Sequence, residues 1–172
     1  VFDRNPFSPR GVAGLSLSLA RNGVTPLVGE WGEAGAAPDI LIVVNPNTAA
    51  VAALVKRLDD VARGGGTVVV SGGGESQTFS SLSRQFGLTI GSQPIGRLQG
   101  DEFSTQSAWR VSGSFERSFV LDGMQVGGVI RIGAGRLVLI ADSCFFCSRN
   151  IEMDTWADLQ NRKFLNELWA VQ

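Results

Sequence analysis

The sequence predicts an α/β fold, a three-layer sandwich with a central and mainly parallel sheet. From residue 40 to residue 86, apolar runs of strand length alternate with segments of helical period, which is the order that βαβ units give. The apolar run Thr67–Val70 lies between two glycine triplets, Gly64–Gly66 and Gly72–Gly74. Continuous apolar runs are typical of parallel strands covered on both faces, and α/β proteins hold ligands at the carboxyl ends of such strands.

The first forty residues predict two strands and one helix. Val1–Asp3 is expected to end a first strand, and Asn5–Gly11 to be a loop because its two prolines forbid a helix. A helix is expected over Gly11–Arg21, where apolar residues recur at spacings of three and four. Thr25–Val28 is predicted to be a short strand and Gly29–Pro38 an Ala/Gly-rich connection.

The next segment predicts two further strands, each followed by a helix. The apolar run Ile40–Val44 is the first of these strands, and Asn45–Thr48 is expected to end it and to cap a helix that reaches about Arg63. After the strand Thr67–Val70, a helix is expected from about Ser76 to Phe86. This β-α-β-α order favours a parallel sheet with right-handed crossovers.

The helical period stops at Leu88, and we expect an antiparallel excursion of β structure around residues 95–132, with Asp122-Gly123 as a turn. A buried parallel strand then returns at Gly135–Asp142, and a last helix is expected at about Thr155–Val171. Residues 1–172 are predicted to form one domain, since the chain is too short for two comfortable cores. The strands expected within the excursion are Ile95–Leu98, Trp109–Val111, Phe115–Leu121 and Gln125–Ile132.

Composition excludes several classes of function. The 172 residues carry a net charge of −1, which argues against a nucleic-acid binder because such proteins need a concentrated basic face. The chain has no histidine and no tyrosine, so Ser-His-Asp and Cys-His catalysis and His-ligated zinc are impossible within it. No apolar run is long enough to cross a bilayer. We expect neither a cofactor nor a metal site.

The second glycine triplet marks a candidate binding loop. Backbone N–H groups at a helix N-terminus favour an anion, so the loop can cradle a negatively charged ligand. It lacks the Lys-Ser/Thr end of a P-loop and the spacing of a dinucleotide fingerprint. We favour the simpler interpretation of a tight turn whose acidic residue complements the helix dipole. The residues of the loop are Ser71, Gly72, Gly73, Gly74 and Glu75.

A polar cluster is predicted at the carboxyl edge of the sheet, where this loop would meet the ends of the other strands. Arg10 could bind a carboxylate or phosphate there through two parallel hydrogen bonds. The alternative is that Arg10 pairs with Asp3 or Asp142 and merely orders the loops. The other residues expected at this edge are Arg4, Ser8, Asn45, Glu75 and Ser143.

Cys144 and Cys147 have the spacing of a redox motif. Three interpretations stand: a local disulfide, a reactive dithiol, or two small buried residues. We favour the disulfide or the inert pair, and an oxidised pair fits a compartment outside the cytoplasm. Trp31 and Trp109 fall in irregular regions and could be exposed anchors for a partner or a sugar, although covering a sheet edge is the simpler role for either.

Four segments together resemble a bacterial family of uncharacterised domains with a flavodoxin-related, class I glutamine-amidotransferase-like fold. They are Asp3–Gly11, Gly64–Val70, Gly135–Ser143 and Asn161–Asn166. The resemblance covers most of the chain and extends to the GIFT domains of an intraflagellar transport protein and of an oligosaccharyltransferase subunit. It implies a non-catalytic binding or assembly module. Glutaminase activity is not implied, because Leu88–Gly96 has no elbow cysteine and the chain has no histidine.

The expected function is therefore a module that binds a small polar ligand, a glycan or a protein partner at the carboxyl edge of the sheet. The resemblance implies that it belongs to a membrane-anchored bacterial protein and lies on the extracytoplasmic face, with the anchor in segments beyond residues 1–172; the alternative is a cytoplasmic location. Val1 already has strand character, so we expect a longer parent protein. Two alternative functions remain: a hydrolase or thiol oxidoreductase that uses Asp, Glu or Cys, and a purely structural domain.

Overall fold

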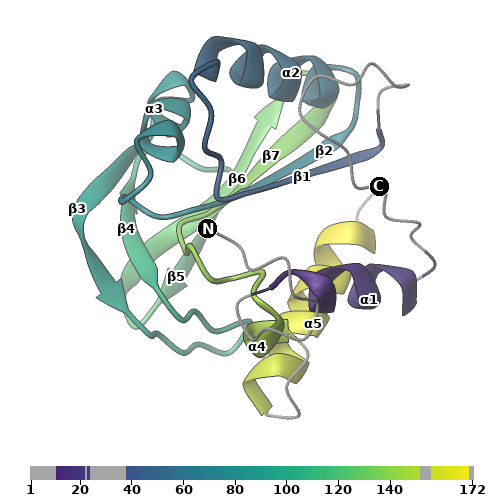
Figure 1. The fold of residues 1–172 in the computed structure, drawn as a ribbon, viewed down its shortest axis with the longest axis vertical. Helices are drawn as coiled ribbons and strands as arrows, with labels where there is room; N and C mark the ends of the chain where they lie inside the picture. Colours follow the sequence, from purple (N-terminus) through teal and green to yellow (C-terminus); the bar gives the residue numbers. More distant parts are fainter. Residues whose placement is uncertain (1–10, 22, 24–37, 152–155, 171–172) are drawn as a thin grey trace.

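A five-stranded sheet runs through the protein, and helices lie on both of its faces (Figure 1). The computed structural model describes residues 11–21, 23, 38–151 and 156–170. The sheet consists of β1 (Ile40–Val44), β2 (Thr67–Ser71), β7 (Gly135–Ile140), β6 (Met124–Ile132) and β5 (Arg117–Leu121), in that spatial order. β3 (Thr89–Gly96) and β4 (Ala108–Ser112) form a second, two-stranded sheet. The helices are α1 (Ala13–Arg21), α2 (Val51–Arg63), α3 (Gln77–Gln85), α4 (Ser148–Ile151) and α5 (Trp156–Ala170).

The strand directions overturn the prediction of a mainly parallel, flavodoxin-like sheet. β1 pairs with β2, and β2 with β7, in parallel, as expected for these three strands. β6 pairs antiparallel with β7, and β5 antiparallel with β6. The physical reason is the connection between β6 and β7, which consists of Gly133 and Ala134 alone. Two residues can close a hairpin but cannot carry a crossover, so the central sheet must be mixed.

Three of the four strands expected around residues 95–132 are present, and two of them, β5 and β6, extend the central sheet instead of leaving it. The strand expected at Ile95–Leu98 is replaced by β3, which covers Thr89–Gly96. Asp122 and Gly123 join β5 to β6 with φ angles of 49° and 74°. Both lie in the left-handed region, which a two-residue hairpin turn requires. The strands predicted at Val1–Asp3 and Thr25–Val28 fall outside the described residues.

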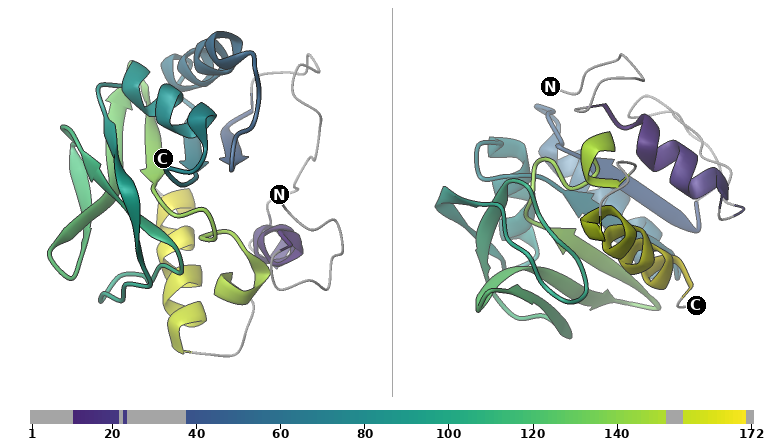
Figure 2. Two further views of the ribbon diagram at one scale, coloured as in Figure 1. Left: turned by 60° about the vertical axis from the view of Figure 1, so that its left-hand side comes forward. Right: turned by 90° about the horizontal axis from the view of Figure 1, so that it is seen from below.

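Both faces of β2 and β7 are buried, which explains their continuous apolar sequences, whereas the edge strand β1 is half-buried along its whole length. One face packs against α2 and α3, and the other against α1 and α5 (Figure 2). Successive residues of β2 and β7 alternate between the two cores. The α2/α3 side receives Val68, Val70, Leu137 and Leu139, and the α1/α5 side receives Val69, Val138 and Ile140.

α2 buries one apolar face, as its period predicts, with Leu54, Leu58 and Val61 in the core. Its N-cap is Ala50, which makes no side-chain capping bond. None of residues 45–48, which were expected to cap this helix, is therefore its N-cap. Thr48 Oγ1 instead accepts from the Ala50 N–H at 3.1 Å. None of the helices in the described part of the chain is both long and apolar enough to span a bilayer.

Four phenylalanines hold the α1/α5 core together across segments that are distant in the sequence. Phe103 stacks on Phe164 with ring centroids 4.4 Å apart, and it meets Phe119 and Phe145 edge to face. Stacked and edge-to-face aromatic pairs contribute beyond the area that they bury. The loop after β3, β5, the segment after β7 and α5 are thereby fixed to one another.

Phe103→Ala is expected to destabilise the protein by about 3–5 kcal/mol, because it removes a ring that is 1% exposed and leaves a cavity. The matched control is Leu159→Ala, since that side chain is 58% exposed and its loss should cost little. Urea denaturation followed by circular dichroism measures both. Equal midpoints for the two variants would contradict the central role of Phe103.

Candidate functional site

The carboxyl ends of the three parallel strands lie side by side and bring together most of the described polar residues expected there. The pairing register places Val44, Ser71 and Ile140 next to one another. Asn45 follows β1, residues 72–75 follow β2, and Asp142 and Ser143 follow β7. The other predicted members, namely Asp3, Arg4, Ser8 and Arg10, lie outside the described residues.

Asn45 ties β1 to both neighbouring strand ends. Its φ of 44° is left-handed, a conformation that asparagine tolerates better than most residues. Its backbone N–H donates to the Ser71 carbonyl at 2.8 Å, and its side-chain Nδ2 donates to the Ser143 carbonyl at 2.7 Å. The turn after β1 is therefore held in place from two sides.

Asp142 acts as an anchor for loops and does not face solvent. Its side chain is fully buried and accepts three backbone N–H groups: Gln106 at 2.7 Å, Ser107 at 3.1 Å and Cys144 at 2.7 Å. Hydrogen bonds to a carboxylate are stronger than neutral ones. Of the roles predicted for Asp142, the structure favours the ordering of loops.

The glycine triplet is filled by the protein's own side chains. A Cβ at Gly72 would lie 2.7 Å from the Phe79 ring, and one at Gly74 would lie 2.5 Å from the Trp109 ring. A Cβ at Gly73 would collide with the Glu75 carboxylate and with Trp109 Nε1. These glycines are needed so that two aromatic rings can approach the backbone closely, which fits the interpretation of a tight turn.

The N-terminus of α3 is capped from within the chain. Ser76 Oγ accepts from the Phe79 N–H at 3.1 Å and donates to the Pro46 carbonyl at 2.8 Å. Ser and Thr are favoured at this position because the hydroxyl satisfies one of the free N–H groups of the first turn. Glu75 precedes the cap and is exposed, so its charge complements the helix dipole as predicted for the simpler interpretation.

Trp109 lies in the core, so the alternative of an exposed anchor is wrong, and its ring covers the glycine loop after β2. It is 7% exposed, and its backbone N–H donates to the Ala141 carbonyl at 2.7 Å, which docks β4 onto the end of β7. The indole covers the glycine loop because the short β4 strand continues the hydrogen bonding of β7. Trp31 lies outside the described residues.

Three side-chain atoms at this edge are buried and have no hydrogen-bond partner in the structure: Asn45 Oδ1, Ser71 Oγ and Trp109 Nε1. Half of the atoms of this kind in the described part of the chain therefore lie at this end of the sheet, with Ser71 on its α1/α5 face and Trp109 on its α2/α3 face. A buried polar atom without a partner costs about 1–3 kcal/mol, so each one calls for an explanation. Sequence reasoning named Asn45 and Ser71 but took no account of Trp109 as a donor.

Cys144 and Cys147 form a disulfide with their Cα atoms 5.0 Å apart. Both residues are buried, at 8% and 4% exposure. Asp142 holds the first of them in place through the Cys144 N–H. Among the residues that the structure describes, no group of three or more His, Cys, Asp or Glu side chains could hold a metal ion.

A network of hydrogen-bonded side-chain amides extends from the loop that Asp142 holds to α5. No sequence motif predicted it. Gln106 Nε2 donates to Asn150 Oδ1 at 3.2 Å, and Asn161 Nδ2 donates to the Asn150 carbonyl at 2.9 Å. Asn161 Oδ1 accepts from the Ser104 N–H at 2.8 Å. Asparagine on the apolar face of a helix is the one sequence signal that could have indicated this network.

No family model and no curated protein sequence matches the chain. Solved structures with a similar fold include the mmIFT52 N-terminal domain, at a TM-score of 0.61 and 17% identity, covering 98% of this chain and 93% of that one. Another is the exo-β-1,4-mannosidase Op5Man5 from Opitutaceae bacterium strain TAV5, at a TM-score of 0.58 and 16% identity. That match covers 91% of this chain, which spans 29% of the mannosidase chain. At these identities the likeness concerns the fold alone.

Asp142→Asn is expected to lower the free energy of unfolding by about 2–3 kcal/mol, because an amide NH₂ would replace one of the oxygens that accept backbone N–H groups. Asp122→Asn is the matched control, since Asp122 is exposed and its left-handed conformation suits asparagine. Chemical denaturation provides the measurement. If both variants unfold at the wild-type midpoint, Asp142 does not anchor the loops.

Proposed function

We propose that the chain is a non-catalytic module that binds a small polar ligand, a glycan or a polar segment of a partner protein at the carboxyl edge of β1, β2 and β7. The observation that carries this proposal is the pair of unpaired buried side-chain oxygens at that edge, Asn45 Oδ1 and Ser71 Oγ. Trp109 Nε1 is also unpaired, but its ring belongs to the α2/α3 core, on the other face of the sheet from Ser71. A ligand that supplies hydrogen bonds to the two oxygens would recover the free energy that their burial costs.

The two atoms differ in what they can bind. Asn45 Oδ1 accepts a hydrogen bond, and Ser71 Oγ both donates and accepts. A hydroxyl group donates and accepts at once, so a sugar or another hydroxylated ligand suits this set. One structural neighbour is part of a mannosidase, which is a further reason to test glycans. Because the atoms are buried, binding requires that the structure around them opens locally.

The proposed location is the extracytoplasmic face of a bacterial membrane, with the anchor in segments beyond this chain. The disulfide between Cys144 and Cys147 supports it, because disulfides persist in oxidising compartments and are rare in the cytosol. The resemblance to domains of membrane-anchored proteins points the same way.

The environments of the reactive groups count against the enzymatic alternative. The Asp142 carboxylate already accepts three backbone N–H groups, and both cysteines are buried in a disulfide. A hydrolase using Asp142 would need that carboxylate free, and a thiol oxidoreductase would need an accessible sulfur. An insulin-reduction assay with Cys144→Ser as the control tests the thiol oxidoreductase alternative. Insulin reduction by the wild type but not by the variant would support that alternative.

The binding proposal is tested by a fragment and glycan screen followed by two-dimensional NMR of the labelled protein. Binding at the proposed site shifts the amide signals of Asn45, Ser71 and residues 72–75. Shifts confined to the opposite edge of the sheet, near the start of β2 and β7, would contradict the proposal.

Ser71→Ala should weaken the binding of any ligand found in this screen by about fivefold or more, because it removes a hydroxyl available to the ligand. The same change should leave the free energy of unfolding unchanged or raise it by about 1 kcal/mol, since the lost Oγ has no partner. The control is Ser83→Ala, whose equally buried Oγ donates to the Phe79 carbonyl at 2.8 Å. That variant should lose stability and keep its affinity; the reverse pattern would show that Ser71 has a purely structural role.

A further inference from the structure

The protein holds one of its own carboxylates against an indole N–H that has no hydrogen-bond partner in the described structure. A Cβ placed on Gly73 would collide with the Glu75 carboxylate and would lie 2.5 Å from Trp109 Nε1, so both groups border the same point. Trp109 is 7% exposed, and its Nε1 is buried and unpaired. The carboxylate is therefore beside this donor but does not accept a hydrogen bond from it.

The loop around this point offers further donors to a negatively charged group. The backbone N–H groups of Gly73, Gly74 and Glu75 donate to no residue that the structure describes. They lead into α3, whose nine residues begin after the Ser76 cap. Free N–H groups at the start of a helix favour an anion, and the helix dipole adds to this. Trp109 Nε1 is an independent donor, because it belongs to β4 and not to the loop or to α3.

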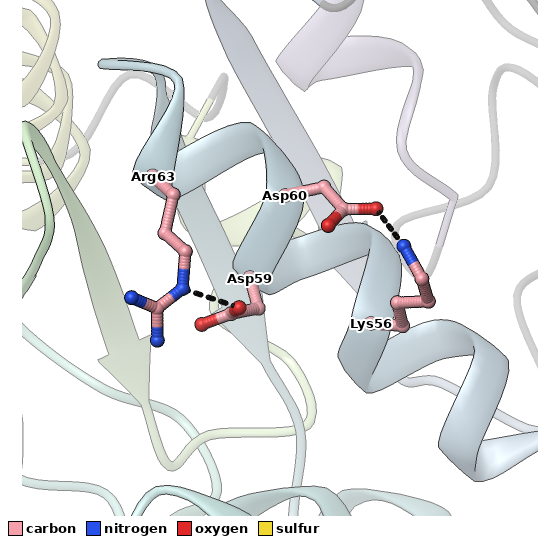
Figure 3. A network of polar contacts seen from close by, with 4 residues as sticks. All are labelled: Lys56, Asp59, Asp60 and Arg63. Carbon is pink, nitrogen blue, oxygen red and sulfur yellow. Dashed lines mark hydrogen bonds and ion pairs between the residues drawn. The ribbon is translucent and has the colours of Figure 1, made fainter.

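Two acids of α2 show how a carboxylate is placed when it serves helix stability alone. Asp60 Oδ2 lies 2.6 Å from Lys56 Nζ, and Asp59 Oδ2 lies 2.6 Å from Arg63 Nε (Figure 3). Ion pairs four residues apart support a helix slightly. Both of these carboxylates are neutralised by a cation, whereas Glu75 forms no ion pair with any described residue.

The helix dipole explains only part of the position of Glu75. An acid next to the N-cap is favourable wherever its side chain points, because the dipole acts over the whole first turn. Glu75 is exposed, so burial of the residue does not force its carboxylate toward Gly73. The absence of a side chain on Gly73 is what admits the carboxylate to this place. The loop thus has room for one carboxylate beside Trp109, and an exposed side chain of the protein fills it.

We propose that the glycine loop after β2 is a carboxylate-binding site, and that Glu75 occupies it when no ligand is bound. Binding exchanges one carboxylate for another: Glu75 turns toward solvent, and the incoming group accepts from Trp109 Nε1 and from the N–H groups of the loop. The ligand is a small organic acid or the C-terminus of a peptide, since both present this group. The site lies on the α2/α3 face of the sheet and is independent of the ligand proposed for Ser71, whose side chain is on the α1/α5 face.

The test follows the indole N–H signal of Trp109 in the ¹⁵N-labelled 172-residue chain while sodium acetate replaces sodium chloride at constant ionic strength. Trp109→Phe identifies the signal by its loss. Glu75→Ala should bind acetate at least about tenfold more tightly than the wild type, because an internal competitor that holds the site most of the time lowers the apparent affinity in that proportion. The matched control is Asp101→Ala, which makes the same change in charge in the loop between β3 and β4 and should leave the affinity unchanged.

Two further arms identify the donor and the source of the carboxylate. Adding Trp109→Phe to Glu75→Ala should weaken acetate binding, followed by the amide signals of residues 73–75, about fivefold or more, because the ring stays and only its donor is lost. Melting curves should show that each variant is folded. N-acetyl-triglycine with a free C-terminus is then compared with acetate. Tighter binding of the peptide indicates a peptide terminus as the ligand, and equal or weaker binding indicates a small organic acid.

Four results would overturn the proposal. One is that acetate shifts the Trp109 signal of Glu75→Ala no more than chloride does. Another is that Asp101→Ala tightens acetate binding as much as Glu75→Ala does, which would reduce the effect to net charge. The third is an acetate affinity that the double variant retains in full, which would place the ion away from the indole. The last is equal binding of the peptide whose C-terminus is amidated, since that peptide has no carboxylate.

Discussion

The described structure depends most on the Asp142 carboxylate and the three backbone N–H groups that it accepts. It stands immediately beyond β7, the strand that joins the parallel and antiparallel halves of the sheet. From there it fixes the loop before β4 and the first cysteine of the disulfide. Because the charge is buried, these donors are needed to stabilise it, so the strand end, the loop and the disulfide segment are coupled through Asp142.

Individual helices and strands were predictable from the sequence because the patterns that indicate them lie within each element. The glycine-bounded run of β2 and the apolar stripe of α2 each indicate one element and the faces that it buries. The overall topology was predicted wrongly because strand direction is a property of the connections. The two residues between β6 and β7 already required a hairpin. The continuous apolar run of β7 hid this, since burial on both faces produces the same run beside a parallel or an antiparallel neighbour.

The candidate site was predictable to the extent that it follows from strand ends. Asn45, Ser71 and Asp142 come together because their three strands run parallel. Their individual roles were not predictable. Whether Asp142 is a ligand group or an anchor depends on N–H groups contributed from about 36 residues away in the sequence. The position of Trp109 over the glycine loop depends on β4 docking at the end of β7, and no motif records that contact.

The distribution of unpaired atoms separates structural from functional roles at this edge. Asp142, Ser76 and Asn161 are polar residues whose hydrogen bonds are made within the chain, and each holds two segments together. Ser71 and Trp109 approach this end of the sheet from opposite faces, and their polar atoms have no hydrogen-bond partner in the described structure. An apolar residue of similar shape at Ser71 would remove that cost without disturbing the backbone. The Ser71 hydroxyl therefore makes no stabilising hydrogen bond in the described structure, in contrast to the hydroxyl of Ser76, which caps α3.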